Sequence, residues 1–369
     1  MKIGILTYHF GTNFGGQLQC YALMKTLESL GHNVTVINYI PGKNKASLID
    51  DIKQCLKIIK KGFTTENIMT GVNCLLKSNK MRRRFDEFRK NNLQVGPLCD
   101  LANFNELYSL DAIVVGSDQV WAPAHHKNAA YFFNFKDGFK GRKISYAPCC
   151  AINKVEPESR AQISNLLSSF NSISVRNIET QNFVKDLIGK DATIVADPTF
   201  LHNFDEFTSS TSPKGEYILT YILGKEIDGG HKSAIQKIKK EYGNIPVYSI
   251  SLTSSKPHYF SWSSKTFHTL DPVEWVDFIR KAKFLYTDSF HGVAFALKFK
   301  TPFLAYYKET IRASRFIDLM ERYKLKNIIN KTSELEGKHI KALQPDKETY
   351  AISESIANKS IEFIKEALL

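Results

Sequence analysis

The sequence predicts an α/β fold built from two doubly wound, Rossmann-like domains. Short apolar runs alternate with amphipathic segments along most of the chain, the pattern of parallel sheets whose strands are joined by helices. A length of 369 residues suits two domains of about 150–200 residues each. A polar stretch at 209–213 separates one series of strand and helix patterns from a second.

The first predicted domain covers residues 1–202. Lys2–Tyr8 and Val34–Tyr39 are predicted strands joined by a helix at Gln17–Leu30, so a βαβ unit and a parallel sheet are expected. A helical insertion at about 48–90 is assigned to this domain. Further strands are predicted at Asp111–Gly116, Lys143–Tyr146, Ser172–Val175 and Thr193–Val195.

The second predicted domain covers residues 203–345 and repeats the alternation. The segment 346–369 is predicted as a C-terminal helix that packs back on the first domain. By analogy, two such domains facing a cleft form a glycosyltransferase-B-like plan. The predicted strands are Tyr217–Leu223, Val247–Ile250, Phe284–Thr287 and Phe303–Tyr306, and the predicted helices are Gly230–Glu241, Pro272–Lys281 and Val293–Leu297.

Composition is that of an ordinary globular protein, with 43% hydrophobic and 24% charged residues. The six cysteines form no CxxC pair, which favours reduced thiols and a cytoplasmic location. The amino terminus is expected to be a strand rather than a signal peptide, and no apolar run approaches the ~18 residues of a membrane span.

The net charge of +13 is partly local, because seven lysines and arginines lie between Lys77 and Lys90. A solvated helix face is the first interpretation, and docking on an anionic membrane surface is the second. No nucleic-acid-binding module accompanies the charge, so nucleic acid is not expected as a partner.

The most informative segment follows the predicted strand at 282–286. His291 and Gly292 lie between this strand and the next helix, where ligands bind in open parallel sheets. Backbone N–H groups at a helix start suit an anion, and an imidazole can give or take a proton near neutral pH. His291 is therefore the first candidate for proton transfer.

Two loops of the first domain have a similar layout. Asn13, Gly15 and Gly16 lie between the first strand and its helix, where glycines allow a close backbone approach or a tight turn. The pattern is not GxGxxG, so a nicotinamide dinucleotide is not expected. Asp118 and Gln119 follow another strand, and Asp118 could be a general base, a hydroxyl binder or a helix cap.

Basic residues after strands point to an anionic ligand. Arg176 follows the strand at 172–175, while Lys308, Arg312 and Arg315 follow the strand at 303–306. Such groups suit carboxylate and phosphate oxygens, although a surface salt bridge is the alternative for a single arginine. The histidines show no metal-ligand spacing, so no metal is expected, and there is no P-loop.

In ordered combination, these motifs resemble the polysaccharide pyruvyl transferase family. The resemblance extends over most of the chain, to about Arg322. It rests on Lys2–Thr7, Asn13–Leu23, Gly116–Trp121, Ser145–Pro148, Ser174–Arg176, Asp197–Thr199 and Asp288–Gly292.

The resemblance implies a transferase that uses phosphoenolpyruvate as co-substrate, with no further cofactor. The implied product is a pyruvate ketal on a sugar, and the implied acceptor is a lipid-linked precursor of a cell-surface polysaccharide. Work at the inner face of a membrane follows from such an acceptor. Ser289 stands where some members have an arginine, so other cations must hold the phosphate. The implied roles are catalysis by His291 and Asp118, donor binding by Arg176, Ser289, Gly292, Lys308, Arg312 and Arg315, and acceptor binding by Asn13, Gly15, Gly16 and Gln119.

Two other functions remain open on the sequence alone. A nucleotide-sugar glycosyltransferase would share the two-domain plan and the basic groups. A non-catalytic protein that binds a phosphorylated ligand would share the anion site without turnover.

Overall fold

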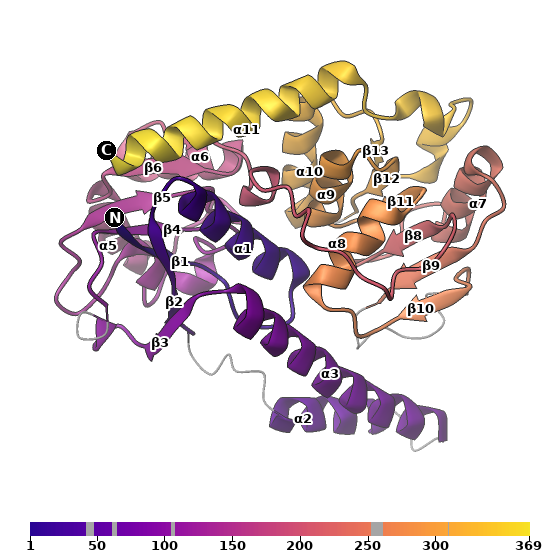
Figure 1. The fold of residues 1–369 in the computed structure, drawn as a ribbon, viewed down its shortest axis with the longest axis horizontal. Coiled ribbons are helices and arrows are strands. Elements are labelled where there is room, and N and C mark those ends of the chain that lie inside the picture. The colour runs from indigo at the N-terminus through magenta and orange to yellow at the C-terminus, as the bar shows by residue number, and fades with distance from the viewer. Residues whose placement is uncertain (42–47, 61–64, 105–107, 252–260, 309) are drawn as a thin grey trace. The chain divides into compact units, whose positions relative to one another are not determined.

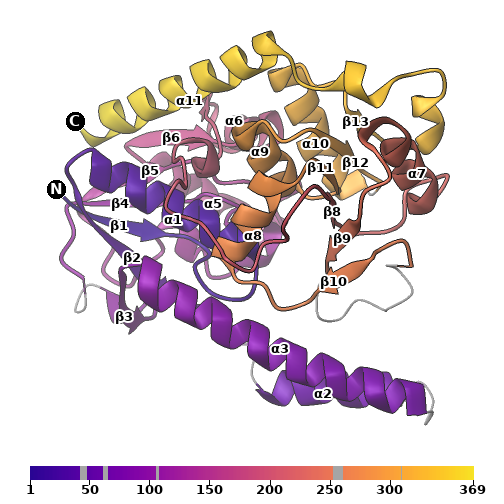
Figure 2. The same cartoon turned by 45° about the vertical axis from the view of Figure 1, so that its right-hand side comes forward.

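The chain forms two compact units in a computed structural model (Figures 1 and 2). The structure describes all residues except 42–47, 61–64, 105–107, 252–260 and 309. The first unit consists of Met1–Gly42, Arg89–Asn203 and Ala351–Leu369, and the second consists of Lys43–Phe88 and Phe204–Tyr350.

The first unit contains a seven-stranded sheet in the order β3-β2-β1-β4-β5-β6-β7, with every neighbouring pair parallel. Its central strand, β4, is apolar and fully buried, and β1 beside it is buried except at Lys2, as expected for a parallel sheet covered on both faces. The strands are β1 (Lys2–Leu6), β2 (Asn33–Tyr39), β3 (Val95–Cys99), β4 (Ala112–Val115), β5 (Arg142–Ser145), β6 (Ser172–Val175) and β7 (Thr193–Ile194).

Helix starts in this unit are set by polar caps. The side chains of Asn13 and Asn177 accept backbone N–H groups at the starts of α1 and α6, and Pro157 opens α5. From Ala351 onward α11 belongs to this unit, where Ser360 Oγ accepts a hydrogen bond from Ala196 N at 2.8 Å. The helices are α1 (Phe14–Ser29), α5 (Pro157–Ser168), α6 (Ile178–Ile188) and α11 (Lys347–Leu368), with 3-10 turns η1 (Pro123–His125), η2 (Ala130–Phe132) and η3 (Pro198–Phe200).

The second unit contains a six-stranded parallel sheet in the order β10-β9-β8-β11-β12-β13. Asp271 and Glu274 form a capping box at the start of α8. The strands are β8 (Ile218–Tyr221), β9 (Val247–Ile250), β10 (Lys265–Phe267), β11 (Phe284–Thr287), β12 (Phe303–Tyr306) and β13 (Ile328–Ile329). The helices are α7 (His231–Tyr242), α8 (Pro272–Lys281), α9 (Phe290–Phe299) and α10 (Thr310–Tyr323), with 3-10 turns η5 (Thr332–Leu335) and η6 (Ile340–Leu343).

The helical insertion differs from its expected placement in the first domain. It forms α2 (Leu48–Ile59) and α3 (Thr65–Asn92), which lie side by side, and residues 43–88 group with the second unit (Figures 1 and 2). The reason is an ion-pair cluster: Arg84 Nη2 lies 2.6 Å from the carboxylate of Asp271 and 2.8 Å from that of Glu274.

Two parallel α/β units confirm the predicted fold class. The predicted strands at 34–39, 172–175, 284–287 and 303–306 are all present. Within the described residues, no helix combines the length and apolarity needed to cross a membrane.

Candidate functional site

The segment around His291 lies at the carboxyl end of β11. Ser289 is the N-cap of α9, and its Oγ accepts a hydrogen bond from Gly292 N at 3.2 Å. A Cβ on Gly292 would lie 2.8 Å from Thr287 Oγ1, so the tight passage from strand to helix requires glycine. His291 is half-buried, while Ser289 and Gly292 are buried. The imidazole is thus held at the positive end of a ten-residue helix.

Asp288 fixes this segment to the neighbouring strand. Its two carboxylate oxygens accept hydrogen bonds from Leu223 N and Gly224 N, each at 2.6 Å. The loop after β8 is therefore joined to the end of β11. Asp288 belongs to the motif Asp288–Gly292 but is not among the predicted site residues, and its position directly after a buried strand is the signal that points to it.

The basic residues of the second unit occupy different surroundings. Lys308 follows β12, the strand next to β11, and its Nζ lies 2.6 Å from Asp228 Oδ1 on the surface. Arg315 is half-buried on α10. The side chain of Arg312 lies outside the described residues. Lys308 and His291 thus follow neighbouring parallel strands, and their donor-binding roles remain predictions.

In the first unit, the loops after β1 and β4 are locked together by Gln19. Its Nε2 donates to Thr7 Oγ1 at 2.9 Å and to Gly16 O at 3.0 Å, and its Oε1 accepts from Ser117 N at 2.9 Å. All these groups are buried. The two glycine-containing loops predicted from the sequence are therefore adjacent, and a buried glutamine that the sequence analysis did not single out connects them.

Arg176 is the centre of a buried ion-pair network. Its side chain is 3% exposed and lies 3.0 Å from Asp197 and 3.4 Å from Asp118. Burial by itself lowers the pKa of Arg176, but Cys149, Asp118 and Asp197 outweigh it and raise this pKa overall. Asp118 therefore pairs with an arginine, and the cap of η1 is Ala122. Donor binding by Arg176 and catalysis by Asp118 remain predictions.

The expected acceptor residues lie in this same unit. Asn13 Oδ1 accepts a hydrogen bond from Gly16 N at 3.2 Å and so caps α1. Gly15 and Gly16 are buried in the first turn of this helix. Gln119 is half-buried, and its backbone O accepts a hydrogen bond from Tyr8 Oη at 3.4 Å. These contacts position the backbone, and acceptor binding stays a prediction.

We expect Gly116→Ala to destabilise the first unit severely. Gly116 has φ +113°, and a Cβ there would lie 2.2 Å from Tyr146 O. The free energy of unfolding should fall by more than about 4 kcal/mol, because a backbone segment has to move. Gly138→Ala is the matched control, since Gly138 has φ +66° and open space around it. It should cost only the ~1–2 kcal/mol of a left-handed alanine. Equal losses in urea unfolding would contradict the steric explanation.

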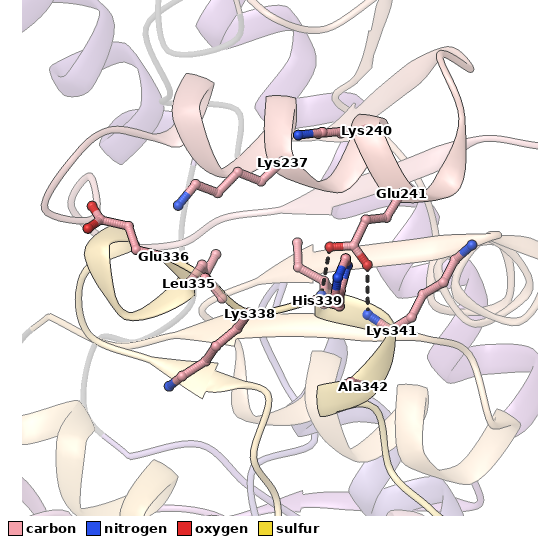
Figure 3. Close-up of a pocket in the computed structure, with 11 residues that line it drawn as sticks. Lys237, Lys240, Glu241, Leu335, Glu336, Lys338, His339, Lys341 and Ala342 are labelled. Atoms are coloured by element: carbon pink, nitrogen blue, oxygen red, sulfur yellow. Dashed lines mark hydrogen bonds between the residues drawn. The ribbon is translucent and has the colours of Figure 1, made fainter.

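A surface cavity of about 870 Å³ lies elsewhere in the second unit (Figure 3). It is lined by Lys237 and Lys240 on α7 and by the segment 335–342. Glu241 joins these elements, because its carboxylate accepts hydrogen bonds from Ile340 N at 2.7 Å and Lys341 N at 3.0 Å. None of the predicted site residues lines this cavity.

Among the described residues, no three or more histidine, cysteine, aspartate or glutamate side chains are grouped so that they could hold a metal ion. All six cysteines are described, and each is buried and unbridged. Burial, followed by the neighbouring Cys149, raises the pKa of Cys150 to about 12. Both thiols of the Cys149-Cys150 pair are buried, in agreement with a packing role.

Comparison with known proteins relates this geometry to a family. The family model described as "Polysaccharide pyruvyl transferase" matches residues 13–307. No curated protein matches the chain. The chain is similar to the crystal structure of Arabidopsis thaliana UGT89C1 complexed with UDP-L-rhamnose, with 10% identity, coverage of 100% of this chain and 99% of that chain, and a TM-score of 0.51.

A second solved structure gives the same result. UDP-GlcNAc 2-epimerase from Methanocaldococcus jannaschii is 11% identical, with coverage of 99% of this chain and 100% of that chain and a TM-score of 0.50. At such identities the likeness concerns the fold alone. Together with the two parallel sheets, it identifies a two-domain, Rossmann-like fold of the GT-B class.

Proposed function

This chain belongs to the polysaccharide pyruvyl transferase family, whose model matches residues 13–307, and we propose that it transfers the pyruvyl group of phosphoenolpyruvate. The acceptor is a sugar of a lipid-linked precursor of a cell-surface polysaccharide. Two hydroxyls of that sugar are bridged by a pyruvate ketal, and phosphate is released.

The observation that carries this proposal is the position of His291. It lies at the junction of β11 and α9, half-buried, and its backbone is fixed by Ser289, Gly292 and the doubly hydrogen-bonded Asp288. The enol carbon of the donor has to receive a proton, and an imidazole held in this way can supply it. Protonation leaves a cation at the adjacent carbon. One hydroxyl adds there, phosphate leaves, and the second hydroxyl closes the ketal.

The donor carries a carboxylate and a phosphate, which call for fixed positive groups. We assign these to Lys308, Arg312 and Arg315 in the second unit, with the amino end of α9 at Ser289 and Gly292. We also assign Arg176 to the binding of phosphoenolpyruvate. Its ion pairs with Asp118 and Asp197 also support a positioning role, because they hold both carboxylates in place.

The acceptor sugar is assigned to the first unit. Asn13, Gly15, Gly16 and Gln119 lie in the loops that Gln19 holds together, so their backbones are fixed before a ligand binds. Asp118 beside them is assigned one of the two hydroxyl protons that ketal formation releases.

Phosphate release tests the proposal against the two other functions. Purified protein is incubated with phosphoenolpyruvate and a candidate lipid-linked sugar. A pyruvyl transferase releases phosphate only when the acceptor is present. A nucleotide-sugar glycosyltransferase consumes a nucleotide sugar instead, and a ligand-binding protein releases nothing.

We further propose that part of α3 docks on anionic lipid. Lys80, Arg83 and Lys90 are exposed, and their spacing places them on one face of the helix. Exposed Asp86 and Glu87 interrupt this face, so the attraction is expected to be weak. The protein should sediment with vesicles of phosphatidylglycerol more than with phosphatidylcholine, and reversal of the three charges should abolish the difference. Equal sedimentation of the unaltered protein with both kinds of vesicle would contradict lipid docking and support the interpretation of a solvated helix face.

A further inference from the structure

A cluster of aromatic side chains lies at the carboxyl edge of the seven-stranded sheet in the first unit. Tyr8 follows β1, while His125 and Tyr131 lie in the turns η1 and η2 that follow β4. Ring centroids are 5.4 Å apart for Tyr8 and His125, 5.8 Å for Tyr8 and Tyr131, and 5.1 Å for His125 and Tyr131. Three rings from separate segments thus meet at the edge where parallel sheets bind ligands.

Tyr8 and His125 form a hydrogen-bonded pair that leads inward from the surface. The Tyr8 hydroxyl contacts His125 Nε2, and Tyr8 is half-buried whereas His125 is only 9% exposed. Burial, with a smaller effect of His126, lowers the pKa of His125 to about 4, so the imidazole is neutral near pH 7. Burial, followed by Asp118, raises the pKa of Tyr8. The phenol is therefore the donor, and its one proton is shared between His125 Nε2 and the backbone O of Gln119, which lies 3.4 Å away.

Tyr131 adds a second observation at the same place. Its ring is fully buried, yet within the described part of the chain its hydroxyl has no hydrogen-bond partner. A buried polar group without a partner is destabilising, and phenylalanine would avoid that loss. Packing alone therefore does not explain a tyrosine beside Tyr8 and His125.

The nearby carboxylate is already engaged by a cation. Asp118 is 7% exposed and pairs with Arg176, which stays charged throughout the accessible pH range. The neutral imidazole of His125 has no carboxylate among the contacts described for it, and its Nε2 lone pair faces the Tyr8 hydroxyl.

We propose that Tyr8 and His125 form the relay that takes the proton from an acceptor-sugar hydroxyl. The inference rests on the proposed pyruvyl transfer. As the sugar oxygen bonds to the donor carbon, its O–H bond breaks and the proton passes to the Tyr8 oxygen. The Tyr8 proton passes at the same time to His125 Nε2, and the imidazolium later releases it to water. Tyr8 and Phe10, whose ring centroids are 5.7 Å apart and whose planes are perpendicular, offer apolar faces to the sugar ring.

The test compares three variants in the same ketal-formation assay. Tyr8→Phe and His125→Gln should each lower kcat by about 100-fold, while KM for phosphoenolpyruvate stays the same. Glutamine can accept the Tyr8 hydrogen bond but cannot take its proton, so it separates proton transfer from packing. Tyr108→Phe is the control, since Tyr108 is a tyrosine of the same unit whose described hydroxyl contacts are the backbone of Pro97 and Asn38 and the side chain of Cys99, none of which belongs to the relay. Its kcat should stay within about threefold.

The outcomes separate the relay from the proposed function. Wild-type kcat in the two relay variants, with an active unaltered protein, would overturn the relay alone. No ketal formation by the unaltered protein with any sugar acceptor would overturn the proposed function, and the relay with it. We expect the same thermal unfolding midpoint for the unaltered protein, Tyr8→Phe and His125→Gln. A rise in KM for phosphoenolpyruvate as large as the fall in kcat would contradict the relay.

Discussion

His291→Ala is expected to lower kcat for ketal formation by about 10²–10⁴-fold, the range for loss of a general acid. The side chain is half-buried at the start of α9, and hydrogen bonds of Ser289 and Asp288 hold the surrounding backbone. The variant should therefore fold normally. Steady-state kinetics with phosphoenolpyruvate and a lipid-linked sugar measure the effect.

His339→Ala is the matched control for this experiment. His339 is an exposed histidine of the same unit, and it lines the surface cavity instead of the β11–α9 junction. Its kcat should remain at the level of the unaltered protein. A His291→Ala variant with similar kcat and an unchanged melting temperature would remove His291 from the mechanism.

Arg176→Ala is expected to lower the free energy of unfolding of the first unit strongly. It leaves the carboxylates of Asp118 and Asp197 buried without their cation, since the two lie 3.4 Å and 3.0 Å from the guanidinium. Removing one partner of a buried ion pair typically costs about 3–5 kcal/mol. Urea unfolding should show that loss, and the β4, β5 and β6 ends should lose protection from hydrogen exchange.

Arg160→Ala provides the comparison within the same unit. Arg160 also pairs with an aspartate, Asp186 at 2.9 Å, but both side chains are about half exposed at 46% and 56%. Exposed pairs contribute little, so its unfolding midpoint should hardly change. Similar midpoints for Arg176→Ala and Arg160→Ala would show that the buried network is not what holds these loops.

The fold was predictable where strands are apolar and central, and less so at the sheet edges. β4 and β11 consist entirely of buried residues, which the sequence shows directly as apolar runs. β3, β10 and β13 were not predicted. They are short edge strands, and β3 contains Gly96 and Pro97 and is largely exposed, so its pairing depends on tertiary context.

The candidate site was predictable in its motifs but not in its pairings. The position of His291 after a strand and the two glycine loops follow from local pattern. That Arg176 pairs with Asp118 and Asp197, or that Tyr8 meets His125, depends on segments 21 to 117 residues apart in the chain. Such contacts exist only after the sheet has formed, and no single segment encodes them.

Mass analysis of the acceptor is the decisive measurement for ketal transfer from phosphoenolpyruvate. Candidate lipid-linked glycans are incubated with the protein and phosphoenolpyruvate, and phosphate is measured in parallel. We expect a glycan to gain one pyruvate ketal for each phosphate released. An unchanged glycan without phosphate release, alongside transfer of a sugar from a nucleotide sugar, would show that the protein is not a pyruvyl transferase.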